Sequence, residues 1–182
     1  MRNCYPTPLR SDADAFQHDE QECRCPRNEA LMQLTIEPAT LNDANTLVAF
    51  ERKVADPKIY GPPLGVQGAI KEISKNTFYF IKRGDILVAT AAYQLRPDKS
   101  VCISNVAVDP KHRRQGIART VMLFILEKCK GTSRIDLVTH PDNKDAIQLY
   151  TSLGFKVESR QENYYGDGEP RLVLVIRGQE SW

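Results

Sequence analysis

The spacing of apolar residues changes at Asp109-Pro110, and this change restricts the folds open to the chain. Upstream, Val101 to Val108 follows the two-residue period of a strand, in which side chains point alternately to opposite faces. Downstream, apolar residues recur with the period of about 3.6 that gathers them on one face of a helix; they are Ile117, Val121, Phe124 and Ile125. Gly131 is expected to close this helix. A strand followed directly by a helix indicates a mixed α/β fold.

The strand from Val101 is expected to be the last of an antiparallel group. Thr77 to Ile81 and Ile86 to Leu95 are rich in β-branched and aromatic residues, and they flank the turn signal Arg83-Gly84-Asp85. This arrangement predicts a hairpin. A second turn at Pro97-Asp98-Lys99 leads into the next strand, so the middle of the chain is predicted to be a meander.

Strands and helices are predicted on both sides of this meander. Leu34 and Ile36 indicate an opening strand, and Pro38 with Thr40 announces a helix whose apolar face holds Leu41, Ala44, Leu47, Val48 and Phe50. Gly61-Pro62-Pro63 precedes a second helix that carries Leu64, Ala69, Ile70 and Ile73. After Gly131 the patterns predict a strand at Ile135 to Thr139, a helix from about Asn143 to Gly154, and strands around Val157 and at Leu172 to Ile176.

The chain length of 182 residues suits one domain with an appendage. Residues 1–32 are polar and punctuated by proline, which predicts a disordered leader or vector remnant. Residues 33–178 are expected to form the domain and residues 179–182 a C-terminal tail. No apolar stretch approaches the roughly 18 to 20 residues that span a bilayer, and the leader lacks the apolar core of a signal peptide. The expected location is the cytoplasm.

Charge and cysteine content exclude several classes of function. The net charge of +2 is too small to indicate a nucleic-acid partner or a membrane surface. The five cysteines are scattered without the dense, even spacing of a disulfide framework, so reduced thiols are expected. Cys23 and Cys25, with Cys4 and His18, match no regular zinc spacing. The sequence therefore predicts no metal site.

The strongest chemical signal is the segment from Val106 to Arg119, which contains the pattern R-x-x-G-x-A. A helix that begins after Gly116 presents free backbone N–H groups and the positive end of its dipole, which suit a pyrophosphate. A glycine at this point lets the backbone approach the phosphate oxygens closely. The alternative is that Gly116 and Ala118 only allow close helix packing, with the basic run Lys111 to Arg114 solvated.

A second motif begins 27 residues after Gly116 and runs from Asn143 to Phe155 as N-x-x-A-x-x-L-Y-x-x-x-G-F. With both motifs in this order, the chain resembles the GNAT superfamily of acetyltransferases between about Leu34 and Ile176. The resemblance implies a mixed, mostly antiparallel sheet of six to seven strands flanked by about four helices, with a V-shaped splay between the fourth and fifth strands. It also implies acetyl-CoA as the acetyl donor and a primary amine as the acceptor.

The resemblance assigns residues to the donor. Tyr150 matches the tyrosine that protonates the departing CoA sulfur, although its ring could simply pack on the helix face. The residues expected to contact acetyl-CoA are Val106, Ala107, Val108, Arg113, Arg114, Gln115, Gly116, Ile117, Ala118, Arg119 and Asn143.

Within the superfamily the chain is most similar to protein N-terminal acetyltransferases of the ribosomal-protein and Ard1 types. The segment from Tyr164 to Glu169 is similar to the Ard1 type, which places Tyr164 and Tyr165 beside a peptide-binding groove. A protein N-terminal α-amine is the favoured acceptor. A small-molecule amine, a lysine, or a catalytically silent acyl-CoA-binding module stay as alternatives, and the protein is expected to be a monomer or a homodimer.

The general base is the weak point of the resemblance. Ribosomal-protein acetyltransferases carry a glutamate at the strand position that aligns with Val138, and valine accepts no proton. Glu51, in the segment after the first helix, is the preferred replacement, and His140 is the second candidate. Removal of the proton through ordered water, or an acceptor amine that arrives deprotonated and needs no base, stay as alternatives. Cys102 is expected to pack in the core.

Overall fold

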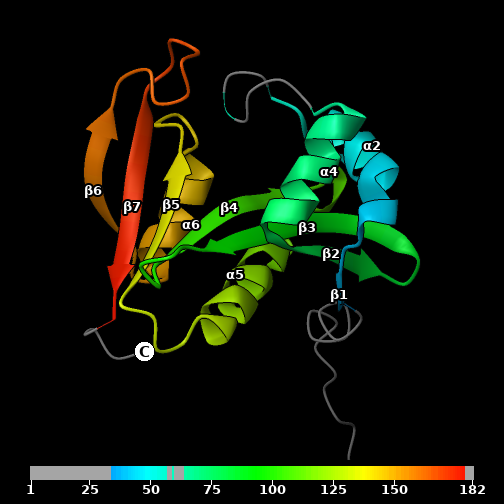
Figure 1. The fold of residues 1–182 in the computed structure, drawn as a ribbon, viewed down its shortest axis with the longest axis horizontal. Coiled ribbons are helices and arrows are strands. Elements are labelled where there is room, and N and C mark those ends of the chain that lie inside the picture. Colours follow the sequence, from blue (N-terminus) through cyan, green and yellow to red (C-terminus); the bar gives the residue numbers. More distant parts are fainter. Residues whose placement is uncertain (1–33, 57–58, 60–63, 179–182) are drawn as a thin grey trace, which may run out of the picture.

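The computed structural model describes residues 34–56, 59 and 64–178, and these form a single seven-stranded sheet in the order β1-β2-β3-β4-β5-β7-β6 (Figure 1). The predicted leader, the Gly61-Pro62-Pro63 break and the tail lie outside the described residues. The strands are β1 Leu34–Pro38, β2 Thr77–Arg83, β3 Ile86–Leu95, β4 Val101–Val108, β5 Arg134–Thr139, β6 Lys156–Gln161 and β7 Arg171–Arg177. All neighbouring pairs are antiparallel except β4 and β5.

Helices cover both faces of the sheet. The α-helices of the described residues are α2 Ala44–Val54, α4 Val66–Lys75, α5 Ile117–Lys128 and α6 Lys144–Ser152. In Figure 1, α2 and α4 lie on one face of β2 to β4, while α5 lies on the other. This is the mixed α/β fold predicted from the sequence, with the expected strand number and helices. None of the described helices is long and apolar enough to cross a membrane.

The strands β4 and β5 separate partway along their length. They pair only at Val101↔Ile135, Cys102↔Asp136 and Ile103↔Leu137. On the other edge of β4, the register with β3 moves from Tyr93↔Ile103 to Ala92↔Asn105, so Ser104 is an extra residue. Such a bulge bends its strand and increases the local twist. The bulge lies where the parallel pairing ends, and the predicted V-shaped splay is confirmed there.

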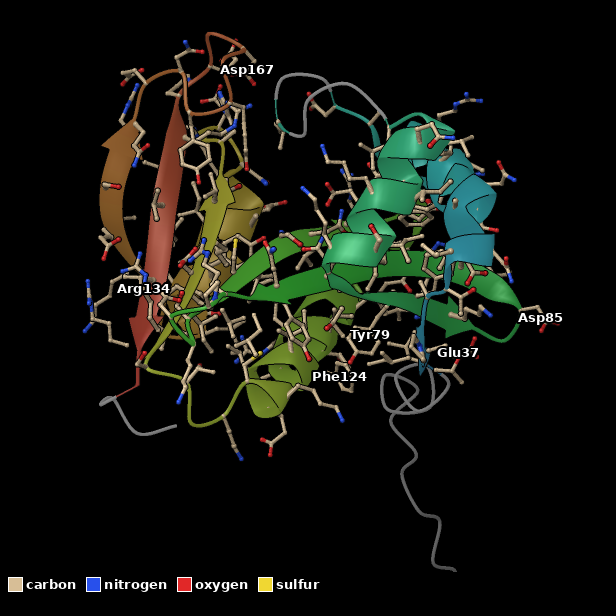
Figure 2. All side chains as sticks on the ribbon, in the orientation of Figure 1. Glu37, Tyr79, Asp85, Phe124, Arg134 and Asp167 are labelled. Atoms are coloured by element: carbon tan, nitrogen blue, oxygen red, sulfur yellow. The ribbon has the colours of Figure 1, made fainter. Side chains whose placement is uncertain are left out.

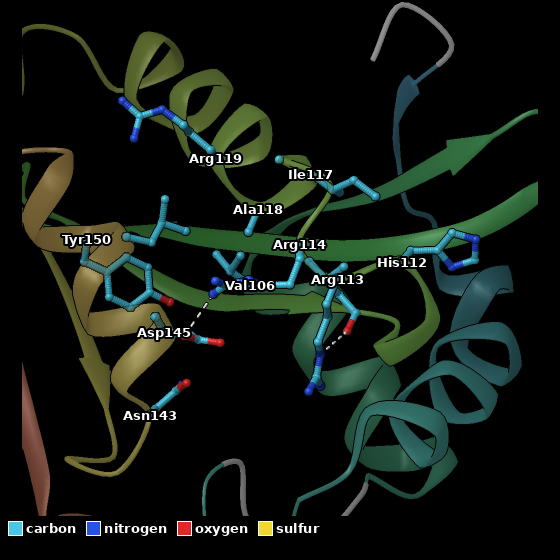
Figure 3. A pocket seen from close by; sticks show the side chains of 14 residues that line it. Val106, His112, Arg113, Arg114, Ile117, Ala118, Arg119, Asn143, Asp145 and Tyr150 are labelled. Atoms are coloured by element: carbon cyan, nitrogen blue, oxygen red, sulfur yellow. Dashed lines mark hydrogen bonds and ion pairs between the residues drawn. The ribbon is translucent and has the colours of Figure 1, made fainter. Parts of the chain in front are cut away.

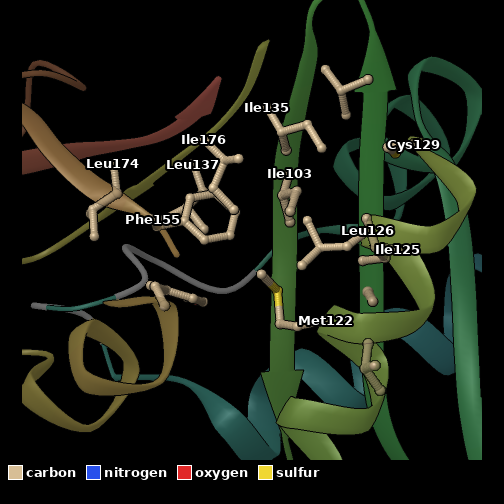
Figure 4. Packing of buried hydrophobic residues seen from close by; sticks show 14 of the residues in the cluster. Ile103, Met122, Ile125, Leu126, Cys129, Ile135, Leu137, Phe155, Leu174 and Ile176 are labelled. Atoms are coloured by element: carbon tan, nitrogen blue, oxygen red, sulfur yellow. The ribbon is translucent and has the colours of Figure 1, made fainter. Parts of the chain in front are cut away.

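A hydrophobic core bridges the two diverging halves of the sheet (Figure 4). Met122 and Ile125 of α5 are fully buried and pack in the same cluster as Ile103 of β4. Phe155 joins them from the other half, together with Leu174 of β7. At the periphery, the ring of Phe124 on α5 meets that of Tyr79 on β2 edge-on at 5.1 Å (Figure 2). The splay is therefore filled from one side by α5 and by the residues after α6.

Two sequence expectations need correction at the level of single residues. Leu41 was expected on the apolar face of the first helix, but it lies in a short 3-10 turn, Leu41–Asp43, and is 54% exposed. Leu64 was expected within the second helix, but α4 begins at Val66. In both cases the apolar residue precedes the helix, because the amphipathic spacing in the sequence begins before the first hydrogen-bonded turn.

Candidate active site

A pocket of about 340 Å³ lies between the start of α5, the splayed half of β4 and one side of α6 (Figure 3). The pocket lies here because the loop after Val108 leads directly into α5, which packs on one face of the sheet. The lining residues are Val106, Val108, His112, Arg113, Arg114, Gly116, Ile117, Ala118, Arg119, Asn143, Asp145, Ala146, Leu149 and Tyr150. Both sequence motifs therefore meet in one cavity.

The loop that enters α5 has a left-handed backbone at two positions. Gly116 is the N-cap of α5 with φ 80° and ψ −4°, and Arg114 has φ 61°. Only glycine adopts such angles without steric strain, so Arg114 is held there by its surroundings. The first backbone bond of the helix runs from the N–H of Thr120 to the carbonyl of Gly116, at 3.0 Å. Gly116 and Ile117 to Arg119 of the first turn line the pocket, and the amides of a first turn, which have no helical partner, suit an anion.

Basic side chains surround this helix start. Arg113 donates from Nε to the carbonyl of Val108 at 3.1 Å, and Arg114 pairs with Asp145 of α6 across the pocket, at 3.0 Å (Figure 3). Arg119 donates to the hydroxyl of Ser152 at 2.9 Å. The arginines thus hold the loop and α6 in place, and each guanidinium keeps further donors for a phosphate.

Two residues expected to contact the donor turn their side chains elsewhere. The amide oxygen of Gln115 accepts from Arg83 of β2 at 2.8 Å, and Gln115 is not among the pocket-lining residues. Ala107 packs in a cluster with Phe50 and Val54 of α2, on the other face of β4. Conversely, the pocket includes four residues that were not among the contacts expected for acetyl-CoA, namely His112, Asp145, Ala146 and Leu149. The signal for the last three was their position within the second motif.

Tyr150 and Asn143 approach the pocket from α6. Tyr150 is 8% exposed, and its ring packs against Phe155 with the centroids 6.0 Å apart. Figure 3 shows the hydroxyl end of Tyr150 directed toward β4, where Val106 lies. Asn143 precedes α6 and donates from Nδ2 to the hydroxyl of Thr139, at 3.0 Å. The Tyr150 ring therefore packs in the core, as expected if its role is structural. Its hydroxyl end is directed toward the pocket, as a proton donor to the CoA sulfur would need.

Glu51 lies against the opposite face of the splayed strand. The amide of Asn105 on β4 donates to Glu51 Oε1 at 3.4 Å, and the Asn105 oxygen accepts from the hydroxyl of Thr90 at 2.9 Å. Thr90 is fully buried, which holds the amide in this orientation. Burial raises the pKa of Glu51, the bond from Asn105 opposes this rise, and the nearby charge of Glu72 adds to it. Glu51 is therefore a better proton acceptor near neutral pH than an exposed glutamate.

His140 follows β5 and is 2% exposed. Its Nδ1 accepts from the backbone N–H of Asp142 at 3.0 Å, and its Nε2 lies 3.1 Å from Glu169 Oε2. Because Nδ1 is an acceptor, this network assigns the neutral-ring proton to Nε2, which donates to Glu169. The ring is absent from the residues that line the pocket. Both ring nitrogens of the second base candidate are therefore already engaged.

Tyr164 and Tyr165 lie in the segment 162–170 between β6 and β7. They are 40% and 63% exposed, and their rings meet edge-on with centroids 4.7 Å apart. The buried guanidinium of Arg171 lies 5.3 Å from the centre of the Tyr165 ring and pairs with Asp167 at 2.6 Å. Figure 2 shows Asp167 at the end of the sheet toward which β5 runs. An exposed aromatic pair therefore stands on an anchored segment.

The other residues considered from the sequence make no competing site. Val138 pairs with Val173 of β7 and offers no proton acceptor. Burial raises the pKa of Cys102 to about 11, so little thiolate is present at neutral pH. No three His, Cys, Asp or Glu side chains gather in a metal-binding arrangement within the described residues. Cys4, Cys23 and Cys25 lie outside them.

Similar proteins were found both by sequence and by structure. The ribosomal protein bS18 alanine N-acetyltransferase of Escherichia coli is 33% identical over 92 residues, an alignment that covers 50% of this chain and 62% of that protein. The crystal structure of Ard1 from Thermoplasma volcanium superposes with a TM-score of 0.70 at 18% identity, over 80% of this chain and 97% of that one. A GNAT acetyltransferase from Elizabethkingia anophelis with acetyl-CoA bound gives 0.64 at 17% identity, over 80% and 98%.

The two structural neighbours share the fold described above, and the sequence relative is matched over less than two thirds of its length. The family match spans residues 47–155, from α2 to the end of the second motif. It thus includes the splayed strand, the start of α5 and Tyr150. This chain belongs to the acetyltransferase (GNAT) family.

Proposed function

We propose that this protein transfers the acetyl group of acetyl-CoA directly to a primary amine, and that a protein N-terminal α-amine is the favoured acceptor. The observation that carries the proposal is the arrangement around the splayed half of β4. An anion-binding pocket lies on one face, and a carboxylate with a raised pKa lies on the other. Two substrates that enter from opposite faces would meet at this strand.

The pocket fits acetyl-CoA in its donor set. The amides at the start of α5, with Arg113, Arg114 and Arg119, would hold the pyrophosphate. Val106 and Val108 offer a flat apolar wall for the pantetheine arm. In the described residues, β4 has no strand partner on the β5 side beyond Ile103. Backbone N–H groups of this free edge can bind the thioester carbonyl and the oxyanion formed from it.

Proton transfers on either side of the attack complete the mechanism. Glu51, directly or through a water molecule, removes a proton from the acceptor ammonium. The neutral amine nitrogen attacks the thioester carbon and forms a tetrahedral oxyanion. The oxyanion then collapses, the C–S bond breaks and the electron pair leaves on sulfur. Tyr150 donates its proton to the thiolate. The proton that remains in excess on the acylated nitrogen passes through solvent to the Tyr150 phenolate, and Glu51 releases its proton to solvent. Acid or base assistance of this kind contributes about a hundredfold to ten-thousandfold.

The contacts of the two base candidates favour Glu51 over His140. Nδ1 of His140 accepts a backbone N–H and Nε2 donates to Glu169, so neither nitrogen is ready to accept a proton from the acceptor. Glu51 accepts a single long bond, at 3.4 Å from Asn105, among the contacts described for its carboxylate. Its carboxylate therefore keeps room for an ammonium donor.

The preferred acceptor is supported by Tyr164 and Tyr165 and by the activity of the relative. An exposed aromatic pair offers a surface for the first residues of a peptide, and the Escherichia coli relative acts on an alanine of a ribosomal protein. That similarity also supports the cytoplasm as the place of the reaction. Val138 supports a small-molecule amine as second candidate, because no acid stands where the ribosomal-protein enzymes carry one.

The experiment is a turnover assay with acetyl-CoA against free N-terminal peptides, lysine peptides and polyamines, in which the rate is measured from the CoA thiol released. Glu51→Gln should abolish most of the rate, whereas Glu127→Gln, an exposed substitution near the C-terminal end of α5, should not change it. Turnover confined to lysine peptides or polyamines would reject the N-terminal acceptor. Tight acetyl-CoA binding without turnover on any amine would indicate an acyl-CoA-binding module.

A further inference from the structure

His140 joins two parts of the molecule that have separate roles in the proposed reaction. It lies between the end of β5 and the start of α6, near Asn143, which lines the pocket proposed to bind acetyl-CoA (the donor pocket). Its ring also reaches Glu169, which lies 29 residues further along the chain on the segment that carries the tyrosine pair. With 2% exposure, the ring exchanges these partners for water only if its surroundings open.

The donor side of this connection is a compact turn. The backbone N–H of Asn143 donates to the carbonyl of His140 at 3.0 Å, while Nδ2 of Asn143 donates to the hydroxyl of Thr139 at 3.0 Å. The N–H of Asp142 donates to His140 Nδ1 at 3.0 Å. Any ligand that fixes Asn143 in the pocket therefore also restricts the His140 ring.

The acceptor side is the segment 162–170, whose residues are linked to one another by hydrogen bonds. The N–H of Glu169 donates to Asp167 Oδ1 at 3.0 Å, and Asp167 Oδ2 accepts from Arg171 at 2.6 Å. The N–H of Gly168 donates to the side-chain oxygen of Asn163 at 2.7 Å. A restraint on Glu169 is thus passed to the whole turn next to Tyr164 and Tyr165.

We propose that His140 is a positioning residue that couples the pocket lined by Asn143 to the segment 162–170, so that CoA bound in the pocket orders this segment through the contact of His140 with Glu169. This inference rests on the proposed function, because it assumes that the pocket lined by Asn143 holds CoA. The coupling is reciprocal: an acceptor that fixes the segment must tighten CoA binding by the same factor. In this proposal Glu51 acts as the base, and His140 connects the pocket to the segment 162–170.

Hydrogen exchange of the full chain, with and without CoA, tests the coupling without any knowledge of the acceptor. CoA should slow exchange of the amides of residues 162–170 in the wild type by about fivefold or more, at the lower end of usual coupling factors. Glu169→Ala should lose this effect. Glu169→Gln keeps an oxygen that accepts from His140 Nε2 and should restore it, and Glu162→Gln serves as the matched control on the same segment.

Glu169 is the better position for the test than His140, because its side chain is 40% exposed whereas that of His140 is 3% exposed. CoA that binds the wild type without slowing exchange in 162–170 would overturn the inference, and so would equal protection in Glu169→Ala. Absence of CoA binding to the wild type, measured by calorimetry, would overturn the proposed function together with it. The first two outcomes leave the proposed function in place, so the two failures are distinguishable.

Discussion

Tyr150 has a ring that packs and a hydroxyl that faces the pocket, and one substitution separates these two properties. In Tyr150→Phe the contact with Phe155 is kept and only the hydroxyl is lost. We expect kcat to fall by about a hundredfold to ten-thousandfold, as for a group that acts in the transition state, with CoA affinity unchanged. Steady-state kinetics and calorimetry measure the two quantities. A wild-type kcat would leave Tyr150 with a packing role alone.

Glu51 is predicted to lower the free energy of unfolding in its charged form, which is the form that the proposed mechanism requires. Burial raises its folded pKa above the ordinary 4.5, so folding favours the protonated carboxyl. Its contribution to the free energy of unfolding is therefore present below pH 4.5 and is lost as pH rises through the raised value. Glu51→Gln, which resembles the protonated form, should have a higher Tm than the wild type at pH 8. The difference should shrink toward pH 4.5. Calorimetry across this range tests the sign, and equal Tm values at pH 8 would refute it.

At the scale of elements, Gly116 before α5 has both a left-handed backbone and a proposed role in binding CoA. A second glycine with the same backbone angle, outside the pocket, distinguishes the effect on stability from the effect on binding. Gly116 at the start of α5 and Gly131 after its end have φ values of 80° and 81°. Alanine at either position should lower the free energy of unfolding by about 1 to 2 kcal/mol, because the left-handed region disfavours a Cβ. Only Gly116→Ala should also weaken CoA binding, by about tenfold or more, since its amides face the pocket. Equal CoA affinities in the two variants would remove Gly116 from the phosphate site.

The bulge at Ser104 is the other element-level feature that decides the site. Because side chains alternate along a strand, one extra residue exchanges the faces of all that follow it. Val106 and Val108 consequently line the pocket at the start of α5, while Asn105 and Ala107 face α2. Without this exchange, the splayed half of β4 would present Asn105 to the donor pocket and its valines to Glu51.

At the scale of the whole molecule, one core cluster holds the two diverging halves of the sheet together. Phe155 is 1% exposed and packs in the cluster that includes residues of α5, β4 and β7. Phe155→Ala should lower the free energy of unfolding by about 3 to 5 kcal/mol and also reduce kcat, because the Tyr150 ring loses its neighbour. Val157→Ala, at a residue 53% exposed, should change the free energy of unfolding by less than about 0.5 kcal/mol. Urea unfolding of both variants measures the difference, and similar losses would contradict this account.

Much of the architecture could be predicted from the sequence because its signals are local. The alternation in Val101–Val108, the helical spacing from Ile117 and the turn at Gly84 each depend on residues close in the chain. The pocket was predictable for the same reason, since its two motifs each occupy a short segment. The splay was expected from the family resemblance alone, since no periodicity marks Ser104 as an extra residue.

Only the tertiary structure decided which side chains face one another across the sheet. Glu51 meets Asn105 from 54 residues away, Gln115 turns to Arg83, and His140 reaches Glu169. These contacts depend on strand register, on the bulge and on helix orientation, which set side-chain direction over distances that no local pattern records. The sequence by itself determined the strands, the helices and the glycine that starts α5 beside the pocket. Glu51 lies on the face of β4 opposite the pocket, and both nitrogens of His140 are engaged, because of how the sheet twists and packs.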